Sequence, residues 1–178
     1  MLPATDETLV VLLDEERRPI GTAPRATVHH AATPLHLAFS CYAFDPAGRL
    51  LVTRRGLGKK TWPGVWTNTC CGHPGPGEDI VEAVTRRLDE ELGLVPREVE
   101  LALPEFTYRA TMTDGTMENE FCPVFRVVVD GDPTPAPAEV AEWHWADWAD
   151  FASAATRTPW LVSPWSALQV PLLEAAAR

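Results

Sequence analysis

The stretch TNTCCGHPGPGE, from Thr67 to Glu78, gathers two adjacent cysteines, a histidine, three glycines and a glutamate. Thiols and imidazoles bind zinc-like metals, and a thiol can also act as a nucleophile or a redox partner. A glycine-rich turn that leads into a helix can hold a phosphate. These residue types therefore allow a zinc site, a redox pair, a nucleophile or a phosphate cradle. Because neighbouring side chains on an extended segment point to opposite faces, at most one of Cys70 and Cys71 should face a ligand.

A pair of carboxylates stands in the segment MENEFC. Glu118 and Glu120 are two residues apart, so on a strand they point to the same face. Two carboxylates held close together repel each other, and a bound cation relieves that repulsion. Alternating glutamates on a solvent-facing strand have the same pattern, and the sequence leaves both interpretations open.

Three of the five histidines could complete such a cation site. His29 and His36 bracket the segment AATPL, and His73 follows Gly72. Three imidazoles with two carboxylates suit zinc or manganese better than magnesium. A single histidine is more often a structural residue than a ligand, and nothing in the spacing alone proves that these three converge.

The positive charges are concentrated although the chain carries a formal net charge of −10. The segment RRGLGKK contains Arg54, Arg55, Lys59 and Lys60. An acidic protein lacks the broad basic face that a nucleic-acid partner requires, so we expect none. A local basic cluster can instead hold a small anion, or it can be a solvated loop.

The segment EDIVEAVTRRLDEELG predicts a helix that follows the glycine-rich turn and ends at Gly93. On a helical wheel, Glu82 and Asp89 face solvent, whereas Glu91 falls at the border of the buried stripe. A carboxylate there is costly unless it is paired or binds a cation, and an ion pair with Arg87 would be the simplest explanation. The apolar positions expected to form the stripe are Ile80, Val81, Val84, Leu88 and Leu92.

The remaining elements must position these side chains. We expect hairpins over residues 8–25 and 35–55, a strand over 119–130 in which Pro123 marks a bulge or an edge, a proline-rich loop over 131–140, and then a strand and two short helices. Strands on both sides of a central helix predict a mixed sheet with helices packed on it.

Length and composition limit the class of protein. The 178 residues suit one domain. The N-terminus has neither the basic start nor the apolar length of a signal peptide, and no run approaches the length that spans a membrane. The four cysteines show no CxxC spacing. We therefore expect a cytoplasmic protein with reduced thiols, no membrane partner, and a monomeric or weakly dimeric state.

The string GHPGPGEDIVEAVTRRLDEELGL, residues 72–94, resembles the Nudix box, a loop–helix–loop that binds a metal ion and a diphosphate. The residues of this chain that match the motif include Gly72, Glu78, Arg86 and Glu90. Where Nudix hydrolases carry a glutamate, this chain has Arg87, which implies diphosphate binding without diphosphate hydrolysis.

The flanking motifs LHLAFS, LLVTRRGLGKKTWPGVWTN, CCGHP, YRATMTDGTMENEFCPVF and TPWLVSPW are together similar to type 1 isopentenyl-diphosphate isomerases, over nearly the whole chain. The resemblance implies an α/β (α+β) fold. It has a Nudix-type mixed β-sheet sandwiched between helices, in a single compact domain over residues 1–178 with an N-terminal β-hairpin extension. It also implies isopentenyl diphosphate as substrate and dimethylallyl diphosphate as product.

The resemblance assigns roles residue by residue. The catalytic residues would be Cys71, Glu120, Tyr108 and Trp165. The diphosphate would bind Arg25, Arg55, Lys59 and Arg87, with Arg25 where the family often has a lysine. A zinc or manganese ion would bind His29, His36, His73, Glu118 and Glu120. A magnesium ion that arrives with the substrate would bind Glu91 and Cys71. No role is assigned to Cys70, Glu90 or His30.

The implied reaction protonates the substrate at C4 and removes a proton from C2 through a tertiary carbocation, which the site must protect from water. We expect Glu120, with Tyr108 hydrogen-bonded to it, to act as the acid and Cys71 to act as a thiolate base. Cations and a nearby helix N-terminus would lower the pKa of that thiol. The ring of Trp165 could stabilise the cation, or Trp165 could be an ordinary core residue.

Two other functions remain open. A Nudix pyrophosphohydrolase acting on a nucleotide would release phosphate. A zinc-stabilised binding module would use its cysteines and histidines only to hold the fold.

Overall fold

The computed structural model describes residues 8–177, so residues 1–7 and 178 of the predicted domain lie outside the described residues. The helices are α1 (Arg25–Val28), α2 (Ile80–Leu92), α3 (Trp148–Arg157), η1 (Pro159–Leu161) and α4 (Pro164–Ala176). The strands are β1 (Leu9–Leu13), β2 (Pro19–Pro24), β3 (His36–Leu37), β4 (Phe39–Phe44), β5 (Leu50–Arg55), β6 (Trp66–Thr67), β7 (Cys70–Gly72), β8 (Pro96–Leu103), β9 (Thr107–Thr111), β10 (Met117–Phe121), β11 (Val124–Val129) and β12 (Val140–Ala146).

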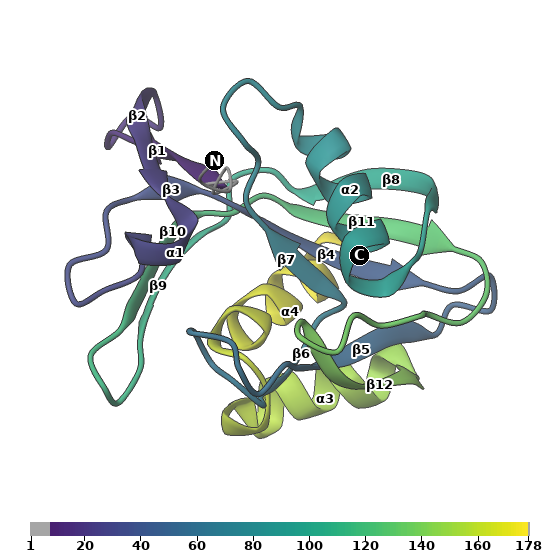
Figure 1. The fold of residues 1–178 in the computed structure, drawn as a ribbon. Helices are drawn as coiled ribbons and strands as arrows, with labels where there is room; N and C mark the ends of the chain where they lie inside the picture. The colour runs from purple at the N-terminus through teal and green to yellow at the C-terminus, as the bar shows by residue number, and fades with distance from the viewer. Residues whose placement is uncertain (1–7, 178) are drawn as a thin grey trace.

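The strands form two sheets, which Figure 1 shows side by side. One sheet has the order β2-β1-β3-β10-β9 and contains the predicted N-terminal hairpin. The other has the order β12-β5-β4-β11-β8, with β6 beside β5 and β7 beside β4. The mixed α+β fold is confirmed, although the sequence predicted one mixed sheet and the structure has two.

Two chain segments pass from one sheet to the other. Strands β3 and β4 are separated by Ala38 alone, and β10 and β11 are separated by Cys122 and Pro123. The segments run parallel in both sheets, since β10 pairs with β3 and β11 pairs with β4. Pro123 has no N–H for a ladder, which explains why the predicted strand over residues 119–130 is divided there. His36, Glu120 and Cys122 consequently lie at or beside the junction of the sheets.

Helices cover both faces of the second sheet, as the fold class predicted. Helix α2 packs on one face against Phe39, Cys41 and Phe125. Helices α3 and α4 pack on the other face, where Tyr42 and Val124 lie. Successive residues of β4 alternate between these two cores, as the period of a strand requires.

Helix α2 ends at Gly93 as predicted, and it begins two residues after Glu78, where the predicted segment started. The Asp79 side chain caps its N-terminus by accepting hydrogen bonds from Val81 N and Glu82 N, and Gly93 ends it in the left-handed conformation with φ 63°. The predicted stripe is wrong at one position, because Val81 is 41% exposed. Ile80 packs on the core as predicted. The buried face of the helix contains two charged residues, Arg87 and Glu91, among Ala83, Val84, Leu88 and Leu92.

The predicted hairpins are present, but the second is short. Strands β1 and β2 pair along their length, whereas β4 and β5 pair only at Phe44 and Leu50. Beyond that pair β7 lies against β4, which brings the cysteine segment beside Ser40 and Cys41.

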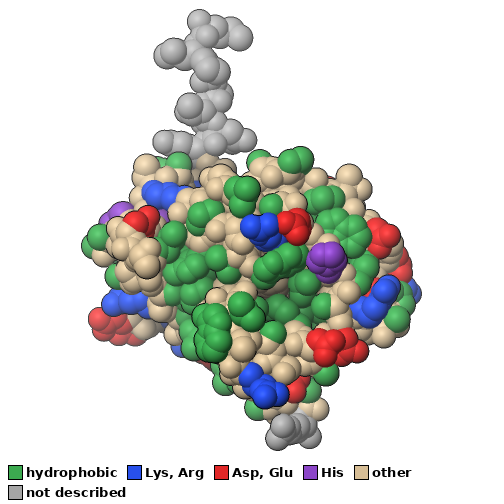
Figure 2. All heavy atoms as spheres, turned by 90° about the horizontal axis from the view of Figure 1, so that it is seen from below, with side chains coloured by type: hydrophobic (Ala, Val, Ile, Leu, Met, Phe, Trp, Pro, Cys, Tyr) green, Lys and Arg blue, Asp and Glu red, His purple; other side chains and the backbone are tan. Residues whose placement is uncertain are grey.

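The side of the molecule that carries α3 has apolar side chains gathered over its middle (Figure 2). Trp160 and Leu161 of η1, with Leu168 and Leu172 of α4, are among the exposed large apolar residues. Within the described residues, no helix has the length and apolar character needed to cross a membrane.

Candidate active site and metal centre

The predicted site residues gather around one cavity of about 310 Å³. All of the predicted catalytic and diphosphate-binding residues line it: Cys71, Glu120, Tyr108, Trp165, Arg25, Arg55, Lys59 and Arg87. His29, His73 and Glu118 line it as well. His36 and Glu91 do not, and both are buried behind its wall.

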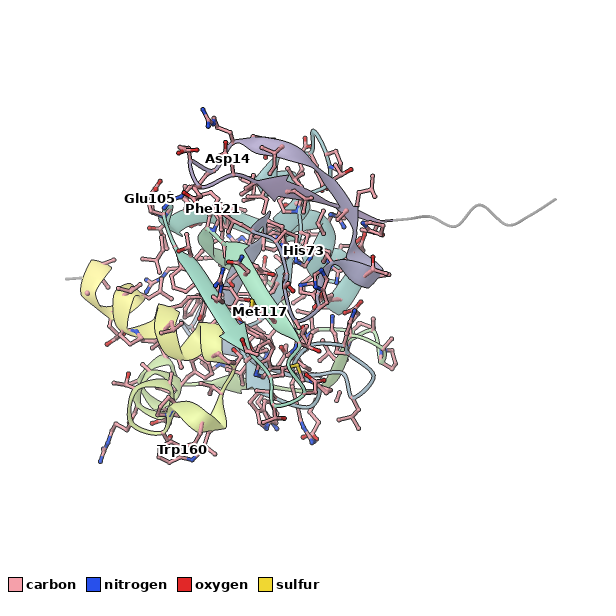
Figure 3. All side chains as sticks on the ribbon, turned by 90° about the vertical axis from the view of Figure 1, so that its left-hand side faces the viewer. Asp14, His73, Glu105, Met117, Phe121 and Trp160 are labelled. Carbon is pink, nitrogen blue, oxygen red and sulfur yellow. The ribbon has the colours of Figure 1, made fainter. Side chains whose placement is uncertain are left out.

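His29, His36, His73 and Glu120 form the part of the site that we call the histidine floor. One potential ligand atom from each of the four lies within 4.8 Å of the others. Glu120 Oε1 is 3.1 Å from His73 Nε2, 3.3 Å from His36 Nε2 and 3.9 Å from His29 Nε2. The pairing of β10 with β3 places Glu120 opposite His36. In the view onto the five-stranded sheet, His73 lies near the middle and Trp160 at the lower edge (Figure 3).

The floor lacks enough hydrogen bonds for its buried polar atoms. His36 Nδ1 is 2.9 Å from the carbonyl of Pro34 and donates to it, so its Nε2 presents a lone pair to the cluster. The Nε2 atoms of His29 and His36 are buried and have no hydrogen-bond partner. Nitrogen and carboxylate lone pairs that face one another repel, and a divalent cation would satisfy all of them. The floor therefore fits a metal ion.

The charges of the floor are strongly perturbed. Burial lowers the pKa of His73 to about 4, helped by neighbouring His36 and His29. Burial also opposes protonation of His36, but the adjacent Glu120 outweighs it and raises that pKa. For Glu120, burial is outweighed by the three imidazoles around it, and its pKa falls well below the usual value. Glu120 is thus a carboxylate at neutral pH.

Glu118 has a different environment from Glu120, although both are buried on one face as predicted. The Tyr108 hydroxyl donates to Glu118, which makes the predicted Tyr108–Glu120 hydrogen bond wrong. In the register of β9 and β10, Tyr108 lies directly opposite Glu120, but its hydroxyl reaches along the same face to Glu118. Burial and the charge of Glu120 raise the pKa of Glu118.

The two adjacent cysteines point to opposite faces, as predicted. Cys70 packs in the apolar core under α2, while Cys71 packs on the other side and lines the cavity. The expected lowering of the Cys71 pKa is wrong for the ligand-free protein, because burial raises it to about 12. The thiol stands on β7, eight residues before Asp79, the N-cap of α2, and its hydrogen-bond partners are Ser40 and Asn68 rather than that helix N-terminus.

Behind Cys71 lies a buried hydrogen-bonded chain that the sequence did not reveal. Tyr42 Oη donates to Gln169 Oε1 at 2.8 Å, and Gln169 Nε2 donates to Ser40 Oγ at 2.8 Å. Ser40 Oγ lies 3.4 Å from the sulfur of Cys71. Because the amide fixes the direction of the chain, the one hydroxyl proton of Ser40 is free to point to a sulfur.

Asn68 contacts the same sulfur from a second side. Its Nδ2 is 3.5 Å and its Oδ1 is 3.6 Å from Cys71 Sγ. Trp165 Nε1 donates to Asn68 Oδ1 at 2.8 Å, which fixes the amide. Both Nδ2 hydrogens also donate to backbone carbonyls, those of Cys41 and Cys70, each at 2.9 Å, so the amide is held in one orientation beside the sulfur.

Trp165 is both a core residue and part of the cavity wall, so the two interpretations of it are compatible. Its side chain is almost fully buried and still lines the cavity. The guanidinium of Arg55 lies 5.1 Å from its ring centroid. Arg55 also donates to the carbonyl of Thr61, at 2.8 Å from Nη2, which holds the arginine against the basic loop.

We call Arg25, Arg55, Lys59 and Arg87 the cationic rim. Arg87 is buried and pairs with Glu90 at 2.7 Å and with Glu91. The simple ion pair between Arg87 and Glu91 that the sequence allowed is therefore present. Burial raises the pKa of Glu91 despite the charge of Arg87. Burial opposes the charge of Arg87, but Glu91 and Glu139 outweigh it and raise that pKa.

The residues without an assigned role have structural partners. Glu90 pairs with both Arg86 and Arg87. Arg86 also pairs with Glu78 at 2.7 Å, which ties the glycine-rich turn to the helix. His30 is exposed, and its Nδ1 accepts from Ala32 N at 3.1 Å.

Comparison with known proteins gives the family. Residues 34–166 match the model of the NUDIX domain. A Frankia alni protein named isopentenyl-diphosphate Delta-isomerase is 62% identical over 95% of this chain and 87% of its own length. Proteins of the same name from Clavibacter sepedonicus, with 59% identity over 93% of this chain and 87% of theirs, and from Mycolicibacterium vanbaalenii, with 56% over 98% and 97%, agree.

Solved structures show the same fold at low identity. DR0079 from Deinococcus radiodurans superposes with a TM-score of 0.68 at 17% identity, covering 96% of this chain and 99% of that one. The relatives favour the isomerase over both the nucleotide pyrophosphohydrolase and the zinc-stabilised binding module. The chain belongs to the Nudix family and, within it, to the isopentenyl-diphosphate Delta-isomerases.

Proposed function

We propose that this enzyme converts isopentenyl diphosphate to dimethylallyl diphosphate at the cavity described above. The observation that carries this proposal is the joint lining of one cavity by Cys71, by Glu120 and by the cationic rim. A proton donor and a proton acceptor at one end, with cations at the other, match a short alkenyl chain attached to a diphosphate.

Two metal ions are proposed to serve the site. The histidine floor, together with the nearby Glu118, would hold zinc or manganese, since imidazoles suit these ions. Such an ion supplies a fixed positive charge that changes the proton affinity of the groups around it. Glu91 and Cys71 would hold magnesium that arrives with the diphosphate. Glu91 is buried and bonded to Arg87, so this ligand requires the arginine to shift.

The protonation states of the ligand-free protein favour one direction of proton transfer. Cys71 carries its proton, because its pKa is raised to about 12, whereas Glu120 does not. We infer that the Cys71 thiol is the donor to C4 and that Glu120 accepts the proton from C2. This reverses the roles expected from the sequence. The free proton of the Ser40 hydroxyl would stabilise the sulfur after it gives up its own proton.

The carbocation at C3 must be shielded from water during its lifetime. Trp165 presents an aromatic ring to the cavity, and a cation over such a face is stabilised by about 2 kcal/mol when desolvated. Tyr108 and Glu118 complete the wall with a hydroxyl already bonded to a carboxylate.

A single incubation tests the proposed reaction. The metal-loaded protein is given isopentenyl diphosphate and magnesium in deuterated water, and the products are analysed by mass spectrometry and NMR. We expect deuterated dimethylallyl diphosphate without free phosphate. Release of phosphate would indicate a hydrolase, and the absence of any product with either zinc or manganese would refute the isomerase.

Further proposals follow from this reaction. The product and substrate place the enzyme in isoprenoid biosynthesis. The Cys71 thiol has to remain reduced, which favours the cytoplasm. One domain over residues 1–178, a monomer or weak dimer, and the absence of nucleic-acid and membrane partners remain predictions.

A further inference from the structure

Glu139 is an acidic side chain in the cavity wall for which the proposed reaction has no use. It stands at the end of the proline-rich loop, directly before β12, and lines the cavity. Its carboxylate pairs with Lys59 through Oε2 and lies 3.5 Å from Arg87 Nη2 through Oε1. Two of the four rim cations are thus in contact with one carboxylate.

The backbone holds Glu139 in this place. Its carbonyl accepts from Gly56 N at 2.8 Å, and the same loop reaches helix α2 where Ala136 N donates to Glu91 O at 2.8 Å. Gly56 lies so close to the loop that a Cβ there would be 2.4 Å from Ala138 O. The loop backbone is therefore held between Gly56 and α2, and a displacement of the Glu139 carboxylate has to come from its side chain.

The contacts of Glu139 keep it charged. Burial opposes ionisation, but the hydrogen bond from Lys59 and the charges of Lys59, Arg87 and Arg25 outweigh it and lower the pKa of Glu139. A phosphate that approaches Lys59 and Arg87 meets this negative charge, and like charges in one site repel.

We propose that Glu139 is a resident competitor at the cationic rim, which a phosphate ligand has to displace from Lys59 and Arg87. A ligand with two phosphate groups offers more charge and more acceptor oxygens than a single phosphate, so it replaces the lost carboxylate contacts more completely. Glu139 thereby selects diphosphates against monophosphates. This inference rests on the proposed function, because it takes the rim as the diphosphate site.

The test compares two inorganic probes, pyrophosphate and orthophosphate, without added magnesium. Calorimetry gives the dissociation constant of each for the metal-loaded wild type and for Glu139→Gln, and metal content is measured afterwards. We expect the variant to bind orthophosphate about tenfold tighter and to bind pyrophosphate tighter by a smaller factor. The dissociation constant for orthophosphate divided by that for pyrophosphate should therefore fall. Glu142→Gln is the matched control, since Glu142 pairs with Arg54 on the surface and does not line the cavity.

Several outcomes overturn the inference. Weaker binding of either probe by Glu139→Gln would show that Glu139 positions the cations rather than competing with the ligand. An unchanged ratio in Glu139→Gln, or an equal change of the ratio in Glu142→Gln, would show that only the net charge of the protein matters and that Glu139 does not select between the two ligands. Glu139→Asp, which retains the charge on a shorter side chain, replaces Glu139→Gln if the latter melts below the assay temperature, and it is expected to lower the ratio partly. Failure of the wild type to bind pyrophosphate would refute the proposed diphosphate site itself.

Discussion

The histidine floor and the cationic rim line the same cavity but differ in how far their polar atoms are already paired. In the floor, Nε2 of His29 and of His36 has no hydrogen-bond partner although both are buried. In the rim, Lys59 and Arg87 already hold carboxylates. A cation at the floor would add interactions that the protein lacks, whereas an anion at the rim exchanges with interactions that the protein has.

This difference predicts different ligand behaviour at the two ends. Adding missing interactions gives tight binding that also stabilises the fold. Exchanging one set of ion pairs for another gives a small net free energy and leaves selectivity to charge and geometry. A long-lived metal and a rapidly exchanging diphosphate suit an enzyme that must release its product.

The largest expected effect is on turnover, in a variant that should leave metal binding at the histidine floor and phosphate binding at the cationic rim unchanged. Cys71→Ala removes the proposed proton donor, and we expect turnover to fall by about 10³-fold while zinc or manganese content, and pyrophosphate affinity without added magnesium, stay near those of the wild type. Steady-state kinetics, metal analysis and calorimetry measure the three quantities. Cys70→Ala is the matched control, because Cys70 packs in the apolar core and should retain most activity. The reverse result would assign the chemistry to the other sulfur.

The next variant disrupts the histidine floor and leaves the cationic rim intact. His36→Gln removes one imidazole from the cluster, so zinc or manganese affinity should fall by more than about 100-fold, and activity with it. Thermal melting with and without metal provides the measurement. We expect metal to raise the melting temperature of the wild type and not of the variant. Equal metal stabilisation of both proteins would mean that the floor is not the metal site.

A smaller effect is expected at the rim. Arg87→Lys retains the positive charge, but an ammonium cannot bond Glu90 and Glu91 in the fork geometry of a guanidinium. We expect KM for isopentenyl diphosphate to rise about tenfold with little change in metal content. Steady-state kinetics at saturating metal measure KM. Loss of metal in this variant would show that the histidine floor and the cationic rim do not act independently.

The sequence predicted the elements whose cause is local. The helix over Ile80–Leu92 follows a glycine-rich turn and ends at a left-handed glycine, so its place in the chain was visible, although its cap by Asp79 was not predicted. The division of residues 119–130 into strands of two sheets was not visible, because it depends on where two distant segments cross. Val81 was misplaced for a related reason, since only the position of the sheet decides which way the first turn faces.

In the site, too, features set by neighbouring residues were predicted and contacts between distant segments were not. The floor was proposed from residue types and from family resemblance, but spacing could not prove convergence. Glu118 and Glu120 were placed on one face correctly, while the partner of Tyr108 was wrong, because the long tyrosine side chain reaches past the residue opposite it to the next residue on the same face. Gln169 is 129 residues from Ser40, and Glu139 is 80 residues from Lys59. Single polar residues at such separations leave no pattern that a sequence could reveal.

The smallest expected effect concerns the cost of the unpaired floor in the metal-free protein. The pKa of His73 is depressed to about 4 from an ordinary value near 6.5, because burial disfavours its charged form. A depressed histidine stabilises the fold above the unfolded pKa, and this contribution is lost as the pH falls from about 6.5 toward 4. The raised pKa of His36 acts in the opposite sense, since its contribution is present below about 6.5 and lost as the pH rises through the folded value.

Replacing one histidine separates these opposing contributions. In His73→Gln the loss between pH 6.5 and 4 should become less steep, by at most about 1.4 kcal/mol per pH unit, which is the slope of one proton. Urea unfolding of chelator-treated protein at a series of pH values measures it. An identical slope in wild type and variant would show that His73 is not held neutral by burial. In that case the floor would already be satisfied without a cation, and its contrast with the rim would disappear.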